Sequence, residues 1–128
     1  MKIKRIHHIA ILTDRYEESK NFYTDVLGCT IVGETYREER QSYKLDLAID
    51  GEYCIELFSF PEYKERNSFP ESKGLRHLAF AVDDVAAWIV YLRSKQVEVQ
   101  DIRIDELTQK KFAFFYDPNG QPLELYEG

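Results

Sequence analysis

The sequence has few cysteines, no long apolar run and no excess of basic residues. Its two cysteines, Cys29 and Cys54, are too few for the disulfide framework of a small secreted domain. No segment approaches the roughly 18 consecutive apolar residues of a transmembrane helix, and the first residues lack the apolar core of a signal peptide. The formal net charge of −6 disfavours binding to a phosphate backbone. We therefore expect a cytoplasmic protein that binds neither membranes nor nucleic acid.

Apolar side chains, by contrast, are plentiful. The 128 residues are 44% hydrophobic and 14% aromatic, which is enough for the core of one domain. Apolar residues at helical spacing predict helices over residues 16–27 and 85–95. Elsewhere the spacing alternates with a period of two, which indicates strands. The predicted strands span residues 5–12, 29–36, 43–49, 52–60, 76–82, 97–104, 112–116 and 122–126.

Polar residues and a glycine mark the ends of these two helices. Asp14 is placed to cap the first helix, with Glu17 three residues later as its capping-box partner. Gly28 follows the last apolar residue and predicts the C-terminal stop. Either Asp83 or Asp84 is expected to cap the second helix.

The two halves of the chain resemble each other in order and in residue type. Residues 8–11 match residues 77–80, and residues 55–57 match residues 123–125, with an aspartate and a helix after each first match. This repetition predicts an α+β fold of two tandem βαβββ modules, with a curved mixed sheet that forms a metal-containing cleft. Within a single domain of residues 1–128, the expected parts are 1–60, a linker over 61–74, and 75–128.

Four polar residues recur at equivalent positions of this repeat. His8, Glu56, His77 and Glu124 each lie between apolar neighbours, on the strand face opposite to the branched apolar side chains. Imidazole nitrogens and carboxylate oxygens bind divalent metals such as Zn²⁺, Ni²⁺, Co²⁺, Mn²⁺ or Fe²⁺. We therefore predict that the four residues bind one metal ion. His7 is expected to point to the opposite face, because adjacent residues of a strand do so.

Several segments also match a known family. They are His8 within residues 6–11, the helix with Phe22-Tyr23 and Leu27-Gly28, Glu56, His77, and Asp117-Pro118-Asn119-Gly120 followed by Glu124. In these motifs nearly the whole chain resembles the vicinal oxygen chelate superfamily of glyoxalases, bleomycin-resistance proteins and extradiol dioxygenases. Dioxygenases and fosfomycin-resistance enzymes of this superfamily typically use two histidines and one glutamate. The additional Glu56 is similar to the His-Glu-His-Glu pattern of glyoxalase I.

This resemblance implies a metal-dependent lyase. Its substrate would be the hemithioacetal of a thiol and an α-oxoaldehyde such as methylglyoxal, converted to a 2-hydroxyacyl thioester through a metal-bound enediolate. Glu124 would move the proton, with Glu56 as the second candidate. The expected cofactor is one Zn²⁺, Ni²⁺ or Co²⁺ ion, with Mn²⁺ or Fe²⁺ as alternatives. We also expect a homodimer whose site forms within one chain or between two chains.

One position departs from the glyoxalase pattern. Leu12 stands where glutathione-dependent glyoxalases carry an arginine that contacts the carboxylate of the thiol. The sequence therefore does not identify the thiol. Substrate-binding candidates are Lys44, Asp46, Arg37 and Lys111, the last as the repeat equivalent of Lys44. Three other functions stay open: a non-catalytic binding protein of the bleomycin-resistance type, an epimerase and a ring-cleaving dioxygenase.

Overall fold

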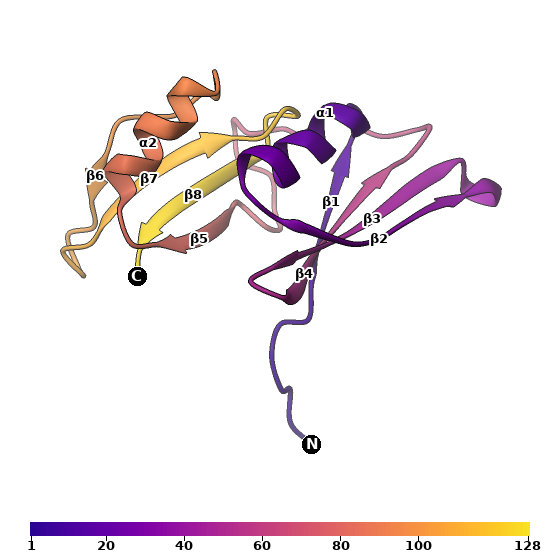
Figure 1. The fold of residues 1–128 in the computed structure, drawn as a ribbon, viewed down its shortest axis with the longest axis horizontal. Helices are drawn as coiled ribbons and strands as arrows, with labels where there is room; N and C mark the ends of the chain where they lie inside the picture. Colours follow the sequence, from indigo (N-terminus) through magenta and orange to yellow (C-terminus); the bar gives the residue numbers. More distant parts are fainter. The chain divides into compact units, whose positions relative to one another are not determined.

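The chain folds into two compact units with the same order of elements. The computed structural model describes all residues 1–128 and divides them into Met1–Lys64 and Glu65–Gly128. Each unit consists of a strand, a helical segment and three further strands, so the predicted α+β class with two βαβββ modules is confirmed (Figure 1). No helix or strand lies between residues 60 and 77. None of the helices has the length and apolar composition of a bilayer-spanning segment.

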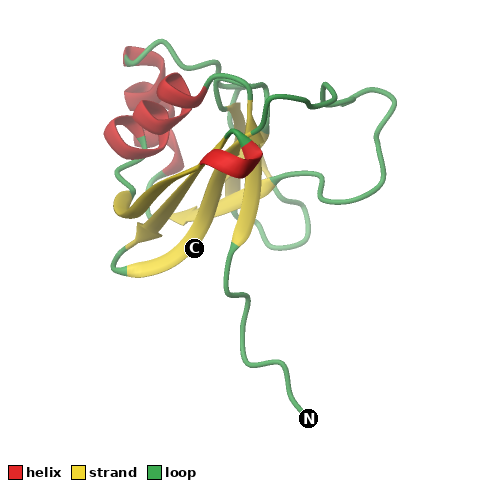
Figure 2. Ribbon diagram, turned by 90° about the vertical axis from the view of Figure 1, so that its right-hand side faces the viewer, coloured by secondary structure: helices red, strands yellow, loops and turns green.

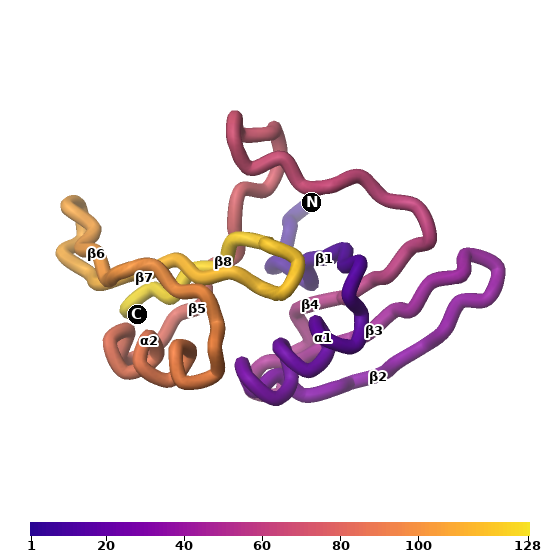
Figure 3. The backbone as a smooth tube through the Cα atoms, turned by 90° about the horizontal axis from the view of Figure 1, so that it is seen from above, coloured from indigo at the N-terminus to yellow at the C-terminus, as the bar shows by residue number.

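The first unit is a four-stranded mixed sheet with a helical segment. Its elements are β1 (Ile9–Thr13), α1 (Tyr16–Asn21), η1 (Phe22–Val26), β2 (Thr30–Arg37), η2 (Glu38–Arg40), β3 (Ser42–Ile49) and β4 (Glu52–Ser59). The order across the sheet is β1-β4-β3-β2, in which β1 and β4 are parallel and the other neighbours antiparallel. The long β2–β3 hairpin turns at η2, as the tube view shows (Figure 3).

The second unit repeats this topology. Its elements are β5 (Leu78–Val82), α2 (Val85–Ser94), β6 (Arg103–Ile104), β7 (Lys111–Tyr116) and β8 (Pro122–Glu127). The order across the sheet is β5-β8-β7-β6, again with a parallel first pair and antiparallel neighbours beyond it. Helix α2 packs against β7 and β8. The first and last strands of each module are therefore direct neighbours, which is what a shared site on these strands requires.

Each unit buries one face of its sheet and leaves the other more accessible. On the buried face, branched and aromatic side chains pack with those of the helical segment, where burial of apolar surface stabilises the fold. The opposite face carries Glu56 in the first unit and Glu124 in the second. The core residues are Ile11, Phe22, Tyr23, Leu45, Leu47, Ile55 and Leu57 in the first unit, and Val85, Ile89, Leu92, Ala113, Phe115, Leu123 and Leu125 in the second.

The first helix differs from its predicted form in its cap and in its second half. It begins after Arg15 without a side-chain cap, so the predicted capping role of Asp14 is wrong. Thr13 instead provides the side-chain contacts at the start of this helix. Its Oγ1 accepts a hydrogen bond from the Arg15 N–H at 2.9 Å and lies 2.7 Å from the buried Ser19 Oγ. From Phe22 the helix continues as a π-helix to Val26. The wider turn allows two adjacent aromatic residues to reach the core.

The other helix boundaries agree with the sequence. Gly28 adopts a φ of +82°, the left-handed conformation that ends a helix and suits glycine. In the second unit Asp84, rather than Asp83, caps α2, because its Oδ1 accepts a hydrogen bond from the Ala87 N–H at 2.9 Å.

Two predicted strands are much shorter in the structure, and the strand predicted from residue 76 begins at Leu78. The first begins at Ile9 instead of residue 5, because its pairing with β4 begins at Ile9↔Ile55. The preceding residues form an extended segment that leads away from the sheet (Figure 2). The strand predicted over residues 97–104 is reduced to β6, and earlier contacts with β7 are limited to an isolated Val99↔Phe115 bridge and the Gln100 N–H bonded to the Phe114 carbonyl.

A charged cluster joins the first helix to β2 and provides a stability test. Glu34 accepts hydrogen bonds from the Tyr16 hydroxyl at 2.5 Å and from Lys20 Nζ at 2.9 Å. These two donors hold the pKa of Glu34 below its ordinary value of 4.5, and the larger effect comes from Tyr16. Because this half-exposed pair is partly screened by water, we expect Glu34→Gln to lower the free energy of unfolding by only about 1 kcal/mol at pH 7.

The pH dependence of this effect follows from the sign of the shift. A lowered pKa in the folded state means that the stabilisation is present above pH 4.5 and is lost as the pH falls through the folded-state value. Urea unfolding of the parent and of Glu34→Gln should therefore converge in acid. The exposed Glu39→Gln is the control, and a gap between parent and Glu34→Gln that stays constant down to acid pH contradicts the assignment.

Candidate functional site

The first unit brings His8 and Glu56 together at the N-terminal end of β1. His8 immediately precedes β1, and Ala10 of β1 pairs with Glu56 of β4. The two side chains meet with His8 Nε2 3.5 Å from Glu56 Oε2. Glu56 is the more buried partner, with 13% of its side chain exposed against 38% for His8. A histidine and a glutamate that are distant in sequence thus face each other on the accessible face of the sheet.

Three further polar side chains surround Glu56. The Tyr53 hydroxyl donates hydrogen bonds to Glu56 and, at 3.1 Å, to Asp46 Oδ1. Lys44 Nζ lies 2.7 Å from Asp46 Oδ1 and 3.6 Å from Glu56 Oε2. Burial, followed by the bond to Glu56, raises the pKa of Tyr53, and the bond to Asp46 raises the pKa of Lys44. The predicted substrate residues Lys44 and Asp46 therefore belong to the surroundings of Glu56, and the lysine charge is engaged by carboxylates.

Tyr53 is a site residue that sequence reasoning missed. Simple alternation places it opposite to Glu56, together with Ile55. The strands β3 and β4 contain an irregularity, however, in which Leu47 pairs with Ile55 but the next residue, Ala48, pairs with Tyr53. The extra residue of this bulge moves Tyr53 to the face of Glu56. The sequence contains no signal for it, because nothing in the alternation of residues 52–57 marks the interruption.

His7 also lies in this cluster, contrary to the predicted orientation. Its Nδ1 lies 2.9 Å from Nδ1 of His8, and its ring packs edge-on against Tyr53 with centroids 5.3 Å apart. The prediction was wrong because it assumed a strand at this position, whereas β1 begins only at Ile9. Outside a strand, adjacent side chains are free to point to the same side.

The second unit forms the equivalent pair, in closer contact. His77 immediately precedes β5, and Glu124 of β8 pairs with Ala79. His77 Nε2 lies 2.7 Å from Glu124 Oε2, and 33% and 10% of the two side chains are exposed. The His77 ring packs edge-on against Phe114, with centroids 5.1 Å apart. Both modules therefore present one imidazole and one carboxylate at the same place in the fold.

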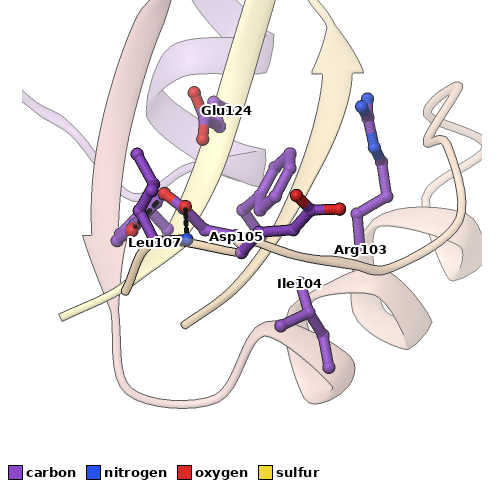
Figure 4. Close-up of a pocket in the computed structure, with 8 residues that line it drawn as sticks. Arg103, Ile104, Asp105, Leu107 and Glu124 are labelled. Atoms are coloured by element: carbon purple, nitrogen blue, oxygen red, sulfur yellow. Dashed lines mark hydrogen bonds between the residues drawn. The ribbon is translucent and has the colours of Figure 1, made fainter. Parts of the chain in front are cut away.

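A pocket of about 490 Å³ opens beside Glu124 (Figure 4). One wall is the loop after β6, which is tied to the sheet by the Tyr126 hydroxyl, a donor to Asp105 Oδ2 at 2.9 Å. Hydrogen bonds hold the pKa of Asp105 below its usual range. The largest effect comes from the Leu107 N–H, followed by the Tyr126 hydroxyl. Glu124 thus has space beside it for a small molecule. The lining residues are Arg103, Ile104, Asp105, Glu106, Leu107, Phe112, Glu124 and Tyr126.

The predicted equivalence of Lys111 and Lys44 is wrong. The prediction aligned the two halves of the sequence at the aspartates of their turns. In the structure, this alignment of β7 with β3 is wrong by one residue. In the structure Glu56 pairs with Asp46, and Glu124 pairs with Phe114. By alternation Lys111 lies on the face opposite to Glu124, because a slip of one residue exchanges the faces of a strand.

Two other predicted positions lie on the Glu56 face of the first sheet. Leu12 pairs with Phe58, so it faces the side on which an arginine would meet the substrate in the glyoxalase pattern. Arg37 stacks its guanidinium over Phe58 and Phe60, at 4.8 and 5.5 Å from the ring centroids, and donates to Ser42 Oγ at 2.8 Å. Its Nε is buried without a hydrogen-bond partner. The guanidinium of Arg37 is therefore fixed by the two rings and by Ser42 on this face of the sheet.

Neither cysteine has the environment of an activated nucleophile. Burial raises the pKa of Cys29 to about 11, and burial also raises the pKa of Cys54. Both thiols are protonated at neutral pH, whereas a reactive cysteine requires the thiolate.

The chemistry of the two His–Glu pairs fits half of a metal site in each unit. Imidazole nitrogen and carboxylate oxygen are ordinary ligands of divalent metals. No group of three or more His, Cys, Asp or Glu side chains suited to holding a metal occurs in the structure. Each unit alone therefore offers two of the ligands that the sequence predicts, and the donor types agree with that prediction.

The comparisons with known proteins define the class. Residues 5–125 match the Glyoxalase/Bleomycin resistance protein/Dioxygenase superfamily, so the chain belongs to this superfamily. It is 57% identical to YaeR of Escherichia coli over 125 residues, covering 98% of this chain and 97% of that protein. The crystal structure of a glyoxalase family protein from Enterococcus faecalis superposes with a TM-score of 0.92 at 42% identity, covering 99% of this chain and 100% of that one.

More distant relatives have named activities. A lactoylglutathione lyase of Schizosaccharomyces pombe is 27% identical over 146 residues, covering 98% of this chain and 48% of that protein. The metallothiol transferase FosB of Staphylococcus epidermidis is 28% identical over 131 residues, covering 98% of this chain and 85% of that protein. The superfamily relatives thus include a lyase and a transferase.

Proposed function

We propose that this chain is a metal-dependent, glyoxalase-I-like enzyme. Its reaction would convert the hemithioacetal of an α-oxoaldehyde, such as methylglyoxal, and a thiol into a 2-hydroxyacyl thioester. The observation that carries the proposal is the repeated pair: His8 with Glu56 and His77 with Glu124, each at the start of the first strand of its module. Two imidazoles and two carboxylates are the ligand pattern of glyoxalase I, and a lactoylglutathione lyase is among the relatives.

The two pairs together would hold one divalent metal ion, with Zn²⁺, Ni²⁺ or Co²⁺ favoured over Mn²⁺ or Fe²⁺. Because neither unit supplies more than one pair, a site with four ligands requires both. We propose a homodimer in which the pairs come from one chain or from two. When bound, the metal would act as a Lewis acid that stabilises negative charge developing on the substrate oxygens.

Glu124 is the better placed of the two candidate bases. Its side chain is only 10% exposed and lines the pocket of about 490 Å³. Glu56 instead accepts a hydrogen bond from Tyr53 and lies 3.6 Å from Lys44 Nζ, so its carboxylate is already engaged by two neighbouring side chains. Glu124 would take the proton from the carbon that bears sulfur and return it to the neighbouring carbonyl carbon. The reaction is then a net isomerisation that needs no oxidant or reductant.

Arg37 is the proposed contact for an acidic group of the thiol in the first unit. Its guanidinium is oriented by Phe58, Phe60 and Ser42. With Leu12 in place of the usual arginine, this side chain offers a cation on the same face of the sheet. We therefore propose that the thiol is bound differently from glutathione in the glutathione-dependent enzymes.

Thiol transfer is the second candidate function. The relatives that carry the name metallothiol transferase match nearly the whole of this chain. The deciding experiment incubates the purified protein, of known metal content, with methylglyoxal and a panel of thiols, and separately with a thiol and an epoxide. Formation of a 2-hydroxyacyl thioester supports the lyase, and a thiol adduct of the epoxide supports the transferase. A metal-loaded protein that turns over no hemithioacetal contradicts the proposal.

Metal content provides a test that is independent of activity. We expect His8→Ala and His77→Ala each to lower the affinity for Zn²⁺ by more than about 100-fold, because loss of a ligand costs more than loss of its hydrogen-bond partner. Elemental analysis and Zn²⁺ titration measure this effect. His7→Ala is the matched control, since His7 contacts His8 but lies outside the predicted ligand set. Retention of half the metal by each ligand variant contradicts a single shared site.

Mixing the two inactive variants distinguishes the origins of the pairs. If each site takes one pair from each chain of a homodimer, unfolding and refolding His8→Ala with His77→Ala restores one intact site in every mixed dimer. The recovered activity is then about a quarter of the parent value. If both pairs of a site come from one chain, the mixture stays inactive. Sedimentation of the parent protein tests the dimer itself.

A further inference from the structure

A second pocket, of about 360 Å³, adjoins His77 and shares Arg103 with the pocket beside Glu124. It is basic: two arginines, Arg76 and Arg103, contribute to its wall, and no aspartate or glutamate does so. The pocket lies entirely within the second unit. Its volume falls at the lower end of the range for small-molecule sites. The lining residues are Ser68, Phe69, Arg76, His77, Gln100, Arg103, Phe114, Tyr116 and Pro122.

Both guanidinium groups are held in place by aromatic rings. Arg103 pairs with Phe112 across β6 and β7, and its guanidinium lies 5.1 Å from the Phe112 centroid and 6.0 Å from that of Phe114. Arg76 lies 5.4 Å from the Phe69 centroid and donates to the Ser68 carbonyl at 3.3 Å. Stacking fixes the plane of a guanidinium while leaving N–H donors at its edge, which prepares it for a planar acceptor.

Neither arginine has a carboxylate partner. The ion pairs of the structure involve other cations, such as Lys20, Lys44 and Arg93, and none includes Arg76 or Arg103. Gln100 and Tyr116 add uncharged polar groups to the wall, and Gln100 Nε2 donates to the Tyr116 hydroxyl at 2.8 Å. Arg103 also lines the pocket beside Glu124, whose wall includes Asp105 and Glu106, so the two pockets are adjacent but differ in charge. Two arginines that form no ion pair and share one cavity suit an anionic ligand.

We propose that this pocket binds a carboxylate group of the substrate, with Arg103 and Arg76 as its donors. The inference rests on the proposed function in one respect, namely that the reacting carbons lie at the His77–Glu124 pair. His77 lines the pocket and touches Phe114, which stacks with Arg103, so the pocket is adjacent to that pair. Bidentate N–H donation from arginine suits a carboxylate in geometry and charge. The substrate class is thereby narrowed to hemithioacetals that carry a carboxylate.

Binding of a probe anion tests the pocket without requiring turnover. Isothermal titration of the purified protein with succinate, and with its neutral analogue succinamide, should show binding of succinate alone. We expect Arg103→Gln and Arg76→Gln each to weaken succinate binding by about 10- to 100-fold. Arg103→Lys retains the charge but loses the planar fork, and an intermediate loss is expected. Arg93→Gln, which removes an equal charge from a residue already paired with Asp101 at 3.1 Å, should bind as the parent does.

Two results overturn the proposal. One is unchanged succinate binding by the double variant Arg76→Gln/Arg103→Gln, which would place the anion at a metal ion or elsewhere. The other is an equal loss in Arg93→Gln, which would reduce the effect to net charge. Circular dichroism of each variant confirms that it is folded, and the two conservative variants, Arg103→Lys and Arg76→Lys, preserve the test where a glutamine variant unfolds.

Turnover then connects the pocket to the reaction. With methylglyoxal and 3-mercaptopropionate, a thiol with a carboxylate, Arg103→Gln should raise KM about 10-fold or more, with a smaller change in kcat. With the uncharged 2-mercaptoethanol the same variant should match the parent. If neither thiol adduct is converted while succinate binding still depends on the two arginines, the proposed reaction fails and the anion site stands.

Discussion

Replacement of Glu124 by glutamine is expected to lower kcat/KM for hemithioacetal isomerisation by about 10²- to 10⁴-fold, the usual contribution of a general base. Glutamine has nearly the same shape as glutamate and retains an oxygen that faces His77, but it cannot accept a proton at neutral pH. The buried position of Glu124, with 10% of its side chain exposed, limits replacement of the base by bulk water. Product formation with methylglyoxal and the best thiol of the panel measures the effect.

The controls separate loss of the base from loss of metal. Glutamine is also a poorer ligand than glutamate, so the metal content of Glu124→Gln must be measured and the assay repeated at saturating metal. Glu127→Gln is the matched variant on the same strand, where alternation places the side chain on the other face and its Oε1 accepts a hydrogen bond from the Lys111 N–H at 3.2 Å. Activity within tenfold of the parent in metal-loaded Glu124→Gln would assign the base elsewhere.

Truncation of Phe115 to alanine is expected to lower the free energy of unfolding by about 3–5 kcal/mol, the range for a fully buried phenylalanine. Phe115 is 0% exposed, pairs with Leu123 across β7 and β8, and lies 6.4 Å from Phe80 between ring centroids. Alanine removes these contacts and leaves a cavity beneath the sheet. Urea unfolding followed by the fluorescence of Trp88, the single tryptophan, reports on the same unit.

The comparison variant for this test is Val90→Ala. Val90 lies on α2 with 71% of its surface exposed, so its truncation should change stability by less than about 0.5 kcal/mol. Circular dichroism, which also detects the strands of the first unit, shows whether the two units unfold in one transition or in two. A loss of less than about 1 kcal/mol in Phe115→Ala would contradict the packing described for the second core.

Most of the correct predictions came from strand alternation and from the internal repeat. They indicated the two βαβββ modules and placed each histidine near its glutamate, because neighbouring first and last strands bring residues 8 and 56, and 77 and 124, to one end of a sheet. Both inferences depend on a period of two that holds over several residues. Where the period is interrupted, the predictions fail.

Three particular failures have this origin. His7 contacts His8 because β1 begins later than its pattern suggests. Tyr53 reaches Glu56 because a bulge in β3 and β4 adds one residue. Lys111 turns away from Glu124 because the two halves differ by one residue between the strand and its turn. Pairing between strands that are distant in sequence decides each of these positions. The sequence of one strand does not specify its register with the partner strand.

The two arginines of the basic pocket also show that strand pairing, and not the sequence of one strand, decides which side chains share a site. Arg76 is adjacent to His77 in the sequence, but Arg103 comes from a strand of two residues that alternation alone overestimates. Only the pairing of Arg103 with Phe112 brings both guanidiniums to one cavity. A short edge strand is defined by the hydrogen bonds that it makes to its neighbour, not by its own composition.

The sequence by itself determined the fold class, the repeat and the histidines and glutamates that form each pair, since these follow from local periodicity and from residue type. The tertiary structure decided which further side chains share their surroundings: Tyr53, Lys44 and His7 in the first unit, and the pocket with Arg76 and Arg103 in the second. The physical reason is that a register shift of one residue costs little in local sequence preference but exchanges the two faces of a strand.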